Sequence, residues 1–410
     1  MSSTTFMLRP LGALERMYHR YMEDFPMHFT VVAEFEETLP VEQVVRALAA
    51  TQARHPLLQA HIVDHSSKGL AFHRPAVRTA IPLRILKQHV DSWRAVAAEE
   101  LSRRFDPSHA PLARAVLIHD NTSSAILLTF YHCITDGIGA MAVLEDVVAA
   151  LNHYDLQGLP LPPSQEEMIA RTLRPRATVE VKRPASEDPR MGPGVPRPFD
   201  NTTPYVSTAA FDPDLTERLI QRCRSEETTV HGALLASVSR ARSSLTGDEF
   251  VRALTPINFR DHIEVQGQCV DYHAAARTGS TPLAEGSFWD QARAASDALQ
   301  DPRSASNIAA ASAAVQQHIP PDVDAATALA VMATFGYDIA VSNLGVVEFQ
   351  RVGAIHPTAL WGPALLCQAE GEQVIGVTTF GGKLRMVACS YTPTDTLLSE
   401  SQMIIESAVR

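Results

Sequence analysis

Hydrophobic residues in the first half of the chain follow two different spacings. Short runs rich in Val, Leu and Phe predict β-strands, whereas apolar residues repeated every three or four positions predict helices. The predicted strands span residues 28–35, 57–63, 112–119 and 125–131, and the predicted helices span 41–52, 92–105 and 137–154. His55-Pro56 ends the first of these helices, because the residue before a proline disfavours the helical conformation.

The second half of the chain also mixes strand and helix patterns. The predicted strands span 206–211, 251–258, 337–344, 374–380 and 384–391, and the predicted helices span 213–226, 230–245, 288–299 and 394–409. The last two strands flank Gly381-Gly382, a two-residue link typical of a β-hairpin. No sequence period of the kind found in solenoids or propellers is present.

Between the two halves the hydrophobic pattern disappears, and ten prolines fall between Pro160 and Pro204. Proline fixes φ and removes a backbone donor, so this stretch predicts an extended crossover with no core of its own. We therefore expect an N-terminal subdomain at residues 1–156, a linker at 157–204 and a C-terminal subdomain at 205–410. The fold class is α/β (α+β), with two similar subdomains and a ligand-binding cleft between them.

Composition and charge narrow the classes of function. The 410 residues are 45% hydrophobic and 20% charged, as is typical of a soluble globular enzyme or scaffold. Asp and Glu number 46 against 35 Lys and Arg, and the net charge of −11 argues against nucleic acid or an anionic membrane as the main partner.

The cysteines and the hydropathy pattern indicate in which cellular compartment we expect the protein. The five cysteines are dispersed and show no C-x-x-C spacing, so neither a disulfide framework nor a structural zinc site is expected. Residues 1–12 show no signal-peptide pattern, and the apolar stretch 325–347 is interrupted by polar residues and predicts a helix, a turn and a strand. We expect a cytoplasmic monomer without a transmembrane segment.

The segment most suggestive of chemistry is Tyr131-His132-Cys133-Ile134-Thr135-Asp136-Gly137, between a very apolar strand and a helix. His132 could act as a general base because an imidazole titrates near neutral pH. Gly137 permits a tight backbone turn. The alternative is purely structural: a core histidine followed by an aspartate that caps the next helix.

This His-x-x-x-Asp-Gly segment resembles the signature of the chloramphenicol acetyltransferase-like, thioester-dependent acyltransferases. The family includes condensation domains of nonribosomal peptide synthetases, plant-type alcohol acyltransferases and polyketide-associated, phthiocerol dimycocerosyl transferase-like enzymes. The last group looks most similar. Further segments resemble its motifs in the same order: Arg9-Pro10-Leu11-Gly12 with Glu15-Arg16, His55-Pro56-Leu57-Leu58, Pro256-Ile257-Asn258-Phe259-Arg260 and Ser342-Asn343-Leu344-Gly345.

Two departures from the family pattern refine this resemblance. Many relatives have a second histidine before the catalytic one, where this chain has Tyr131. We expect Tyr131 to point away from substrate, because adjacent strand residues face opposite sides. The Asp-Phe-Gly-Trp-Gly segment of the plant-type enzymes is absent, which favours the bacterial polyketide-associated branch.

The resemblance implies two related subdomains with a tunnel between them and His132 midway along it. His132 would deprotonate an acceptor hydroxyl that attacks an acyl thioester directly, without an acyl-enzyme. Asp136 would point away from the imidazole and pair with Arg260, making Asp136, Gly137 and Arg260 structural residues at the active site. Asn343 and Ser342 would line the tunnel, with Asn343 as a candidate contact to the oxyanion or to substrate, although Asn343 could instead be a turn residue.

The implied co-substrate is acyl-CoA or a phosphopantetheinyl acyl-carrier protein, with no permanently bound cofactor. Neither H-E-x-x-H nor a nucleophile elbow, Walker loop or dinucleotide motif occurs, so we infer no metal. A Cys133–His132 dyad is disfavoured because we place the two residues on opposite strand faces. An acidic carrier protein could dock on basic helix faces, or those faces could simply be solvated; they carry Arg103, Arg104, Arg218, Arg222 and Arg224.

The sequence leaves three other functions possible. The same base could deprotonate an amine and form an amide. The chain could be a catalytically silent carrier-protein docking module, although the intact His132, Asp136 and Gly137 argue against it. A thioesterase would need only water in the acceptor channel.

Overall fold

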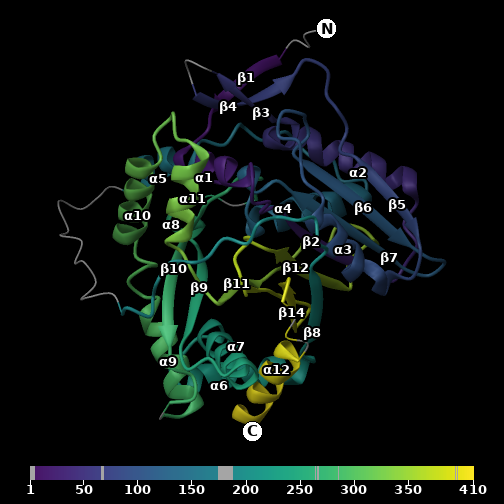
Figure 1. The fold of residues 1–410 in the computed structure, drawn as a ribbon. Helices are drawn as coiled ribbons and strands as arrows, with labels where there is room; N and C mark the ends of the chain where they lie inside the picture. The colour runs from purple at the N-terminus through teal and green to yellow at the C-terminus, as the bar shows by residue number, and fades with distance from the viewer. Residues whose placement is uncertain are drawn as a thin grey trace.

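The computed structural model describes residues 5–65, 69–173, 188–263, 265, 267–284, 286–392, 394 and 396–410. Residues 174–187 of the predicted linker lie outside the described residues. The described chain forms three sheets with helices packed around them (Figure 1).

A five-stranded sheet forms the centre of the first half. Its order is β12 (Ala359–Leu365), β2 (Phe29–Phe35), β7 (Ser124–Phe130), β6 (Ala113–His119) and β5 (Leu83–Lys87). Side chains alternate between its faces. Val31, Ala33 and Phe35 belong to a core shared with helices α2 (Val41–Arg54) and α4 (Gly137–Leu151). Val32 faces the other way, toward helix α3 (Trp93–Ser102) and the second half.

A six-stranded sheet forms the centre of the second half. Its order is β10 (His273–Ser280), β9 (Val251–Asn258), β11 (Ile339–Val346), β13 (Gln373–Phe380), β14 (Lys383–Ser390) and β8 (Tyr205–Ala210). One face packs on four helices, α6 (Pro213–Ser225), α7 (Val230–Thr246), α9 (Phe288–Ala298) and α12 (Leu397–Ala408). Gly381 and Gly382 adopt φ values of 58° and 75°, which suits the tight hairpin between β13 and β14.

The two large sheets meet through a separate hydrophobic cluster. It combines Val32, Val116 and Trp93 from the first half with Val374 and Val387 from the second. Trp93 packs against Trp361 of β12, with ring centroids 5.5 Å apart. β12 itself pairs antiparallel with β2, so a strand from the second half of the sequence completes the first sheet.

A smaller layer closes one end of the molecule (Figure 1). It holds a three-stranded sheet, β1 (Thr5–Pro10), β4 (Gly69–Pro75) and β3 (His61–His65). Five helices lie below that sheet in the same view, α1 (Ala13–Met22), α5 (Gln165–Thr172), α8 (Arg260–Ile263), α10 (Ala305–His318) and α11 (Ala325–Ala333). Short 3-10 turns are η1 (Pro56–Gln59), η2 (Val90–Ser92) and η3 (His132–Ile134). Helix α1 packs against α10, α11 and η3.

The predicted mixed α/β architecture is confirmed, and several predicted elements need correction. Residues 57–63 do not form one strand, because Pro56 starts the 3-10 turn η1 before β3 begins. The sequence patterns missed β1, β4, β5, β10, β12, α1, α5, α8 and α10, whereas α11 begins the stretch 325–347 where a helix, a turn and a strand were predicted. The subdomain boundaries at residues 156 and 204 stay a prediction.

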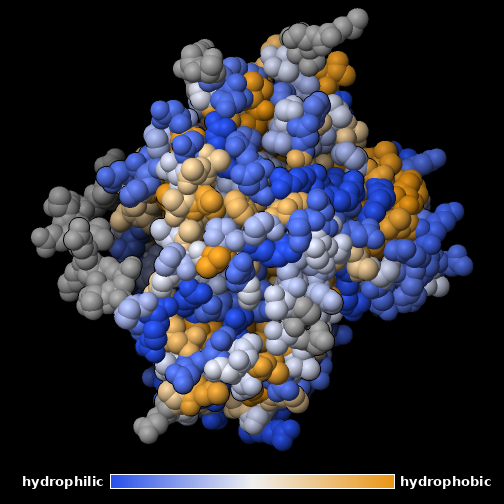
Figure 2. Space-filling view, viewed as in Figure 1, coloured by the Kyte–Doolittle hydropathy of each residue, from blue (hydrophilic) through white to orange (hydrophobic). Residues whose placement is uncertain are grey.

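Figure 2 shows the hydropathy of one face of the molecule. Hydrophilic residues predominate on the face in Figure 2, and hydrophobic residues are scattered over it in small groups. None of the helices in the described ranges is long and apolar enough to cross a lipid bilayer.

Candidate active site

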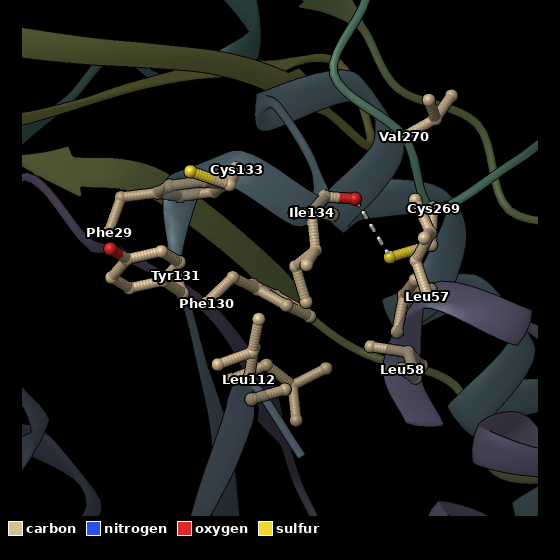
Figure 3. Packing of buried hydrophobic residues seen from close by; sticks show 14 of the residues in the cluster. Phe29, Leu57, Leu58, Leu112, Phe130, Tyr131, Cys133, Ile134, Cys269 and Val270 are labelled. Carbon is tan, nitrogen blue, oxygen red and sulfur yellow. Dashed lines mark hydrogen bonds between the residues drawn. The ribbon is translucent and has the colours of Figure 1, made fainter. Parts of the chain in front are cut away.

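His132 lies on the 3-10 turn η3 that follows β7, and only 7% of it is exposed. The expectation that this residue and Cys133 alternate on a strand was therefore wrong in its geometry, because β7 ends at Phe130. Cys133 nevertheless packs in the hydrophobic core near Phe29 and Tyr131 (Figure 3). Its thiol donates a hydrogen bond to the Glu15 carbonyl, and burial raises the pKa of Cys133 well above its ordinary value. A buried protonated thiol is a poor nucleophile.

Tyr131 also points away from the imidazole of His132. Its hydroxyl lies 3.1 Å from Nδ1 of His19, and both side chains are buried. The position that holds a second histidine in many relatives is thus occupied by a residue that packs in the core.

The loop before β10 is bound to this turn (Figure 3). Cys269 Sγ donates to the Ile134 carbonyl at 3.4 Å, and the backbone N–H of Cys269 donates to Nδ1 of His55 at 3.3 Å. Val270 packs in the same hydrophobic core. Residues from the second half of the sequence therefore help to shape the His132 turn.

Asp136 and Arg260 form a buried ion pair. Arg260 donates to both carboxylate oxygens of Asp136, at 2.7 and 3.0 Å, and also to the carbonyls of Val270 and Tyr272. Asp136 additionally caps helix α4 by accepting from the Gly139 N–H at 2.8 Å and accepts from the Tyr272 N–H at 2.9 Å. The residue is thus both an ion-pair partner and a helix cap.

Gly137 allows the close approach of a second-half strand. A Cβ atom at this position would lie 2.7 Å from Cδ2 of Leu344, on β11. A side chain at residue 137 would therefore displace the Leu344 side chain from the start of α4.

Asp271 lies beside His132 in the folded chain, although the sequence patterns did not single it out. Its side chain is fully buried, and Oδ2 lies 3.4 Å from Nδ1 of His132. Its other oxygen, Oδ1, accepts from Nδ1 of His273 at 2.5 Å. Nε2 of His273 lies 3.0 Å from the hydroxyl of Tyr18, on helix α1.

These contacts set the charges of the cluster. Burial alone would raise the pKa of Asp271, but His273 and His132 outweigh it and hold this pKa well below its usual value. Burial likewise disfavours charge on His273, but the Asp271 carboxylate outweighs it and raises the pKa of His273. Burial raises the pKa of Tyr18. Asp271 and His273 thus form an ion pair next to His132.

Asp136, Asp271 and His273 each have a potential metal-ligand atom within 4.8 Å of the others. Both oxygens of Asp136 already accept from Arg260, and Asp271 binds His273. A metal ion would have to displace a guanidinium from a buried carboxylate, so this donor set suits hydrogen bonding better than metal binding.

Two cavities meet at His132. The larger, of about 480 Å³, is lined mainly by apolar side chains of α1, α10 and α11 and by residues of β9, β10 and β11. The smaller, of about 180 Å³, is lined by Asp136, Gly137, Arg260 and Asn343, among others. Both cavities are lined by His132, Pro256, His273, Ser342 and Leu365.

The predicted tunnel residues occupy β11 at this junction. Ser342 borders both cavities, whereas Asn343 borders only the smaller one. The Asn343 side-chain oxygen accepts from the Gly345 N–H at 2.9 Å, as expected of a turn residue, so its amide nitrogen is the part left to meet a ligand.

The arginines considered for docking differ in availability. Arg218 pairs with Asp214 at 3.0 Å and Arg222 with Glu226 at 2.9 Å, each within its own helix face. Arg103 pairs with Glu100 at 2.8 Å, and Arg104 donates to the carbonyls of Glu23 and Asp24. Four of the five arginines named for docking thus have a partner in the structure, and Arg103, Arg218 and Arg222 are exposed side chains in ion pairs of the kind found on solvated helix faces.

Known proteins share this fold at low sequence identity. No model of a protein family matches the chain. Polyketide synthase associated protein 5 from Mycobacterium tuberculosis is similar over 99% of both chains, with a TM-score of 0.71 and 14% identity. The first condensation domain of the CDA synthetase is similar over 98% of this chain and 95% of that chain, with a TM-score of 0.68 and 13% identity. The chain has the condensation-domain fold.

This fold has two chloramphenicol acetyltransferase-like subdomains, as the His-x-x-x-Asp-Gly resemblance implied. Among curated sequences, tyrocidine synthase 3 of Brevibacillus parabrevis is 26% identical over 245 residues, which are 56% of this chain and 4% of that protein. Cyclosporin synthetase simA of Tolypocladium inflatum is 22% identical over 251 residues, which are 58% of this chain and 2% of that protein. The chain therefore matches only a small part of each of these synthetases.

Proposed function

We propose that the protein is an acyltransferase that moves an acyl group from a thioester to an acceptor hydroxyl, with His132 as general base. The observation that supports it best is the position of His132, on a buried turn where two cavities meet. One cavity can admit the acyl donor and the other the acceptor, so that the reacting atoms come together at the imidazole.

The chemistry follows from a single base. His132 takes the proton of the acceptor hydroxyl while that oxygen attacks the thioester carbonyl carbon. The tetrahedral intermediate then expels the thiolate as the carbon–sulfur bond breaks, and the protonated imidazole returns the proton to sulfur. The ester forms without an acyl-enzyme, which agrees with the buried thiol of Cys133.

The oxyanion of that intermediate needs a hydrogen-bond donor, and losing one such donor typically costs about 2.7–4 kcal/mol of transition-state stabilisation. Ser342 is our candidate, because it borders both cavities together with His132. The amide nitrogen of Asn343 is a candidate contact to substrate in the smaller cavity.

The larger cavity favours a hydrocarbon chain as part of the substrate. Leu14, Met17, Ile308, Val315 and Leu329 are among its lining residues. Transfer of each methylene into such surroundings contributes about 0.8 kcal/mol. We assign this cavity to the aliphatic part of the donor or of a lipid-like acceptor.

The donor is an acyl-CoA or an acyl-carrier protein, and an amine acceptor is the main alternative to an alcohol. Amide formation requires the same base and differs only in the nucleophile. A silent docking module is less consistent with an imidazole that borders both cavities, and a thioesterase would use water as the acceptor.

The test is a panel assay read by mass spectrometry. Acyl-CoA and carrier-bound donors of several chain lengths would be combined with alcohols, amines or buffer alone. We expect ester formation with an alcohol and a donor with a long chain. If amide is the only product, the acceptor is an amine and not an alcohol. If free acid is the only product, the protein is a thioesterase. No turnover with any donor and acceptor pair would contradict the proposal.

A further inference from the structure

Asp271 and His132 present unused polar atoms to each other. Nδ1 of His132 and Oδ2 of Asp271 are both buried, and neither has a hydrogen-bond partner among the described residues. They lie 3.4 Å apart, at the long end of hydrogen-bond distances, but the N–H direction does not meet the geometry of a hydrogen bond. Because a buried polar atom without a partner is costly, pairing these two atoms with each other would remove the cost for both.

We infer that Asp271 is a positioning residue for His132 and that His273 moderates its effect. The inference rests on the proposed function of His132 as a base. Asp271 would hold the proton of the neutral imidazole on Nδ1, which leaves Nε2 free to accept the proton of the acceptor.

The tautomer follows from the charge on Asp271. An ionised carboxylate only accepts hydrogen bonds, so it favours the imidazole form with hydrogen on Nδ1. When Nε2 takes the acceptor proton, the nearby negative charge stabilises the imidazolium that forms. The proton on Nδ1 stays on His132, and Asp271 stays ionised throughout.

His273 binds the other oxygen of the Asp271 carboxylate. Its Nδ1 donates to Oδ1 of Asp271, and its Nε2 faces the Tyr18 hydroxyl. A protonated His273 neutralises part of the charge that His132 senses. The other charged groups nearby are Asp136 and Arg260, which neutralise each other as an ion pair. His273 is thus the residue that sets how strongly Asp271 acts on His132.

Two substitutions should move the pH dependence of turnover in opposite directions. Asp271→Asn removes the negative charge, so kcat should fall by about 10²-fold or more and the acid limb of the pH–rate profile should move to lower pH. His273→Asn can keep a donor to Asp271 but removes the positive charge. The carboxylate then acts on His132 without that cation, and the acid limb should move to higher pH.

A structural role for Asp271 would give a different pattern. Glu100→Gln is the matched control, because Glu100 is a fully buried carboxylate paired with Arg114. It should lower stability and leave the pH profile in place. If Asp271→Asn and His273→Asn left the acid limb unmoved, or moved it in the same direction, the inference would be overturned.

A measurement without substrate separates this inference from the proposed function. Nitrogen-15 NMR of histidine-labelled wild-type protein reports which ring nitrogen carries the proton, with the His132 resonance assigned by its loss in His132→Gln. We expect hydrogen on Nδ1 of His132. If the hydrogen is on Nε2, the role of Asp271 is overturned, even if acyl transfer is observed. If the hydrogen is on Nδ1 but no acyl transfer occurs, the role of Asp271 stands and only the proposed function is contradicted. The wild-type spectrum decides the point even if Asp271→Asn does not fold.

Discussion

At the scale of single residues, Asp136 links the two halves of the sequence. It caps α4 in the first half and accepts from Arg260 and the Tyr272 N–H in the second. Breaking a buried ion pair from one side typically costs about 3–5 kcal/mol, because the other charge is left uncompensated. Asp136→Ala and Arg260→Ala should each lower the free energy of unfolding by roughly that amount, together with activity.

The double variant tests whether the two residues act together. It should lose less stability than the sum of the single losses, because the second substitution removes the stranded charge. Chemical denaturation of all four proteins measures this coupling. Additive losses would show that Asp136 and Arg260 do not stabilise each other, and would leave Asp136 with its hydrogen bonds from the Gly139 and Tyr272 N–H groups.

His231 provides a pH-dependent test within the core of the second half. Burial lowers its pKa to about 3, and its Nε2 lies 3.0 Å from the hydroxyl of Thr255. The folded chain keeps this side chain neutral while the unfolded chain protonates it below about pH 6.5. Its contribution to stability is therefore lost as the pH falls below about 6.5.

Between pH 6.5 and pH 5 that loss amounts to about 2 kcal/mol, at 1.36 kcal/mol per pH unit. His231→Asn should thus lose about 2 kcal/mol less than wild type between pH 7 and pH 5, as measured by urea denaturation at both pH values. The exposed His89, changed to Asn, is the control and should keep the wild-type pH dependence. Equal pH dependence in wild type and His231→Asn would show that His231 is protonated in the folded state.

The sequence singled out His132, Asp136, Gly137 and Arg260 as candidates because three of them form a recognisable segment and the fourth lies in a matching motif. Asp271 and His273 had no such signal. Asp271 lies in the loop before β10, and His273 is the first residue of that strand, whose Ala-Ala-Ala-Arg-Thr-Gly sequence is not rich in β-branched or aromatic residues. The position of the loop follows from tertiary contacts with the η3 turn and Arg260.

At the scale of elements, helix α10 forms one wall of the larger cavity. Ile308, Ala311, Ser312 and Val315 line it at helical spacing, and Ala313 is not among the lining residues. Ala311→Trp should fill part of the cavity. We expect turnover of long-chain substrates to fall at least tenfold, with little change for an acetyl donor and an alcohol that has a short chain.

Ala313→Trp is the matched control on the same helix. The measurement is kcat/KM of wild type and of both variants as a function of the substrate's chain length. Equal losses for long and short substrates with Ala311→Trp, or the same chain-length dependence in both variants, would remove the larger cavity as the hydrocarbon site.

Elements were predictable where local sequence decides the conformation. The Gly381-Gly382 hairpin and the strand 251–258 have strong local patterns, and β9 has the bounds that were predicted. Helix α10 is rich in alanine and has one fully buried apolar side chain, Ile308. Such a helix gives a weak amphipathic pattern, so its existence was not evident from periodicity. Helix α11 lies in the apolar stretch 325–347, where a helix was predicted.

At the scale of the whole molecule, two halves of similar composition suggested two subdomains. The sequence did not indicate that β12 leaves the second half to pair with β2. This exchange depends on long-range pairing and on packing such as that of Trp361 against Trp93, which no local pattern reveals. The candidate site likewise lies between the halves, because both cavities use residues from each.

Direct transfer by His132 is the central claim, and one comparison tests it most directly. Intact-mass spectrometry would follow acyl transfer by wild type, His132→Ala and Cys133→Ser, with the donor and acceptor that the panel identifies. We predict product from wild type and Cys133→Ser, a loss of at least about 10²-fold in His132→Ala, and no acylated enzyme at any time. A folded His132→Ala variant with wild-type turnover, or an inactive Cys133→Ser together with a stable acyl-thioester on the wild-type enzyme, would contradict it.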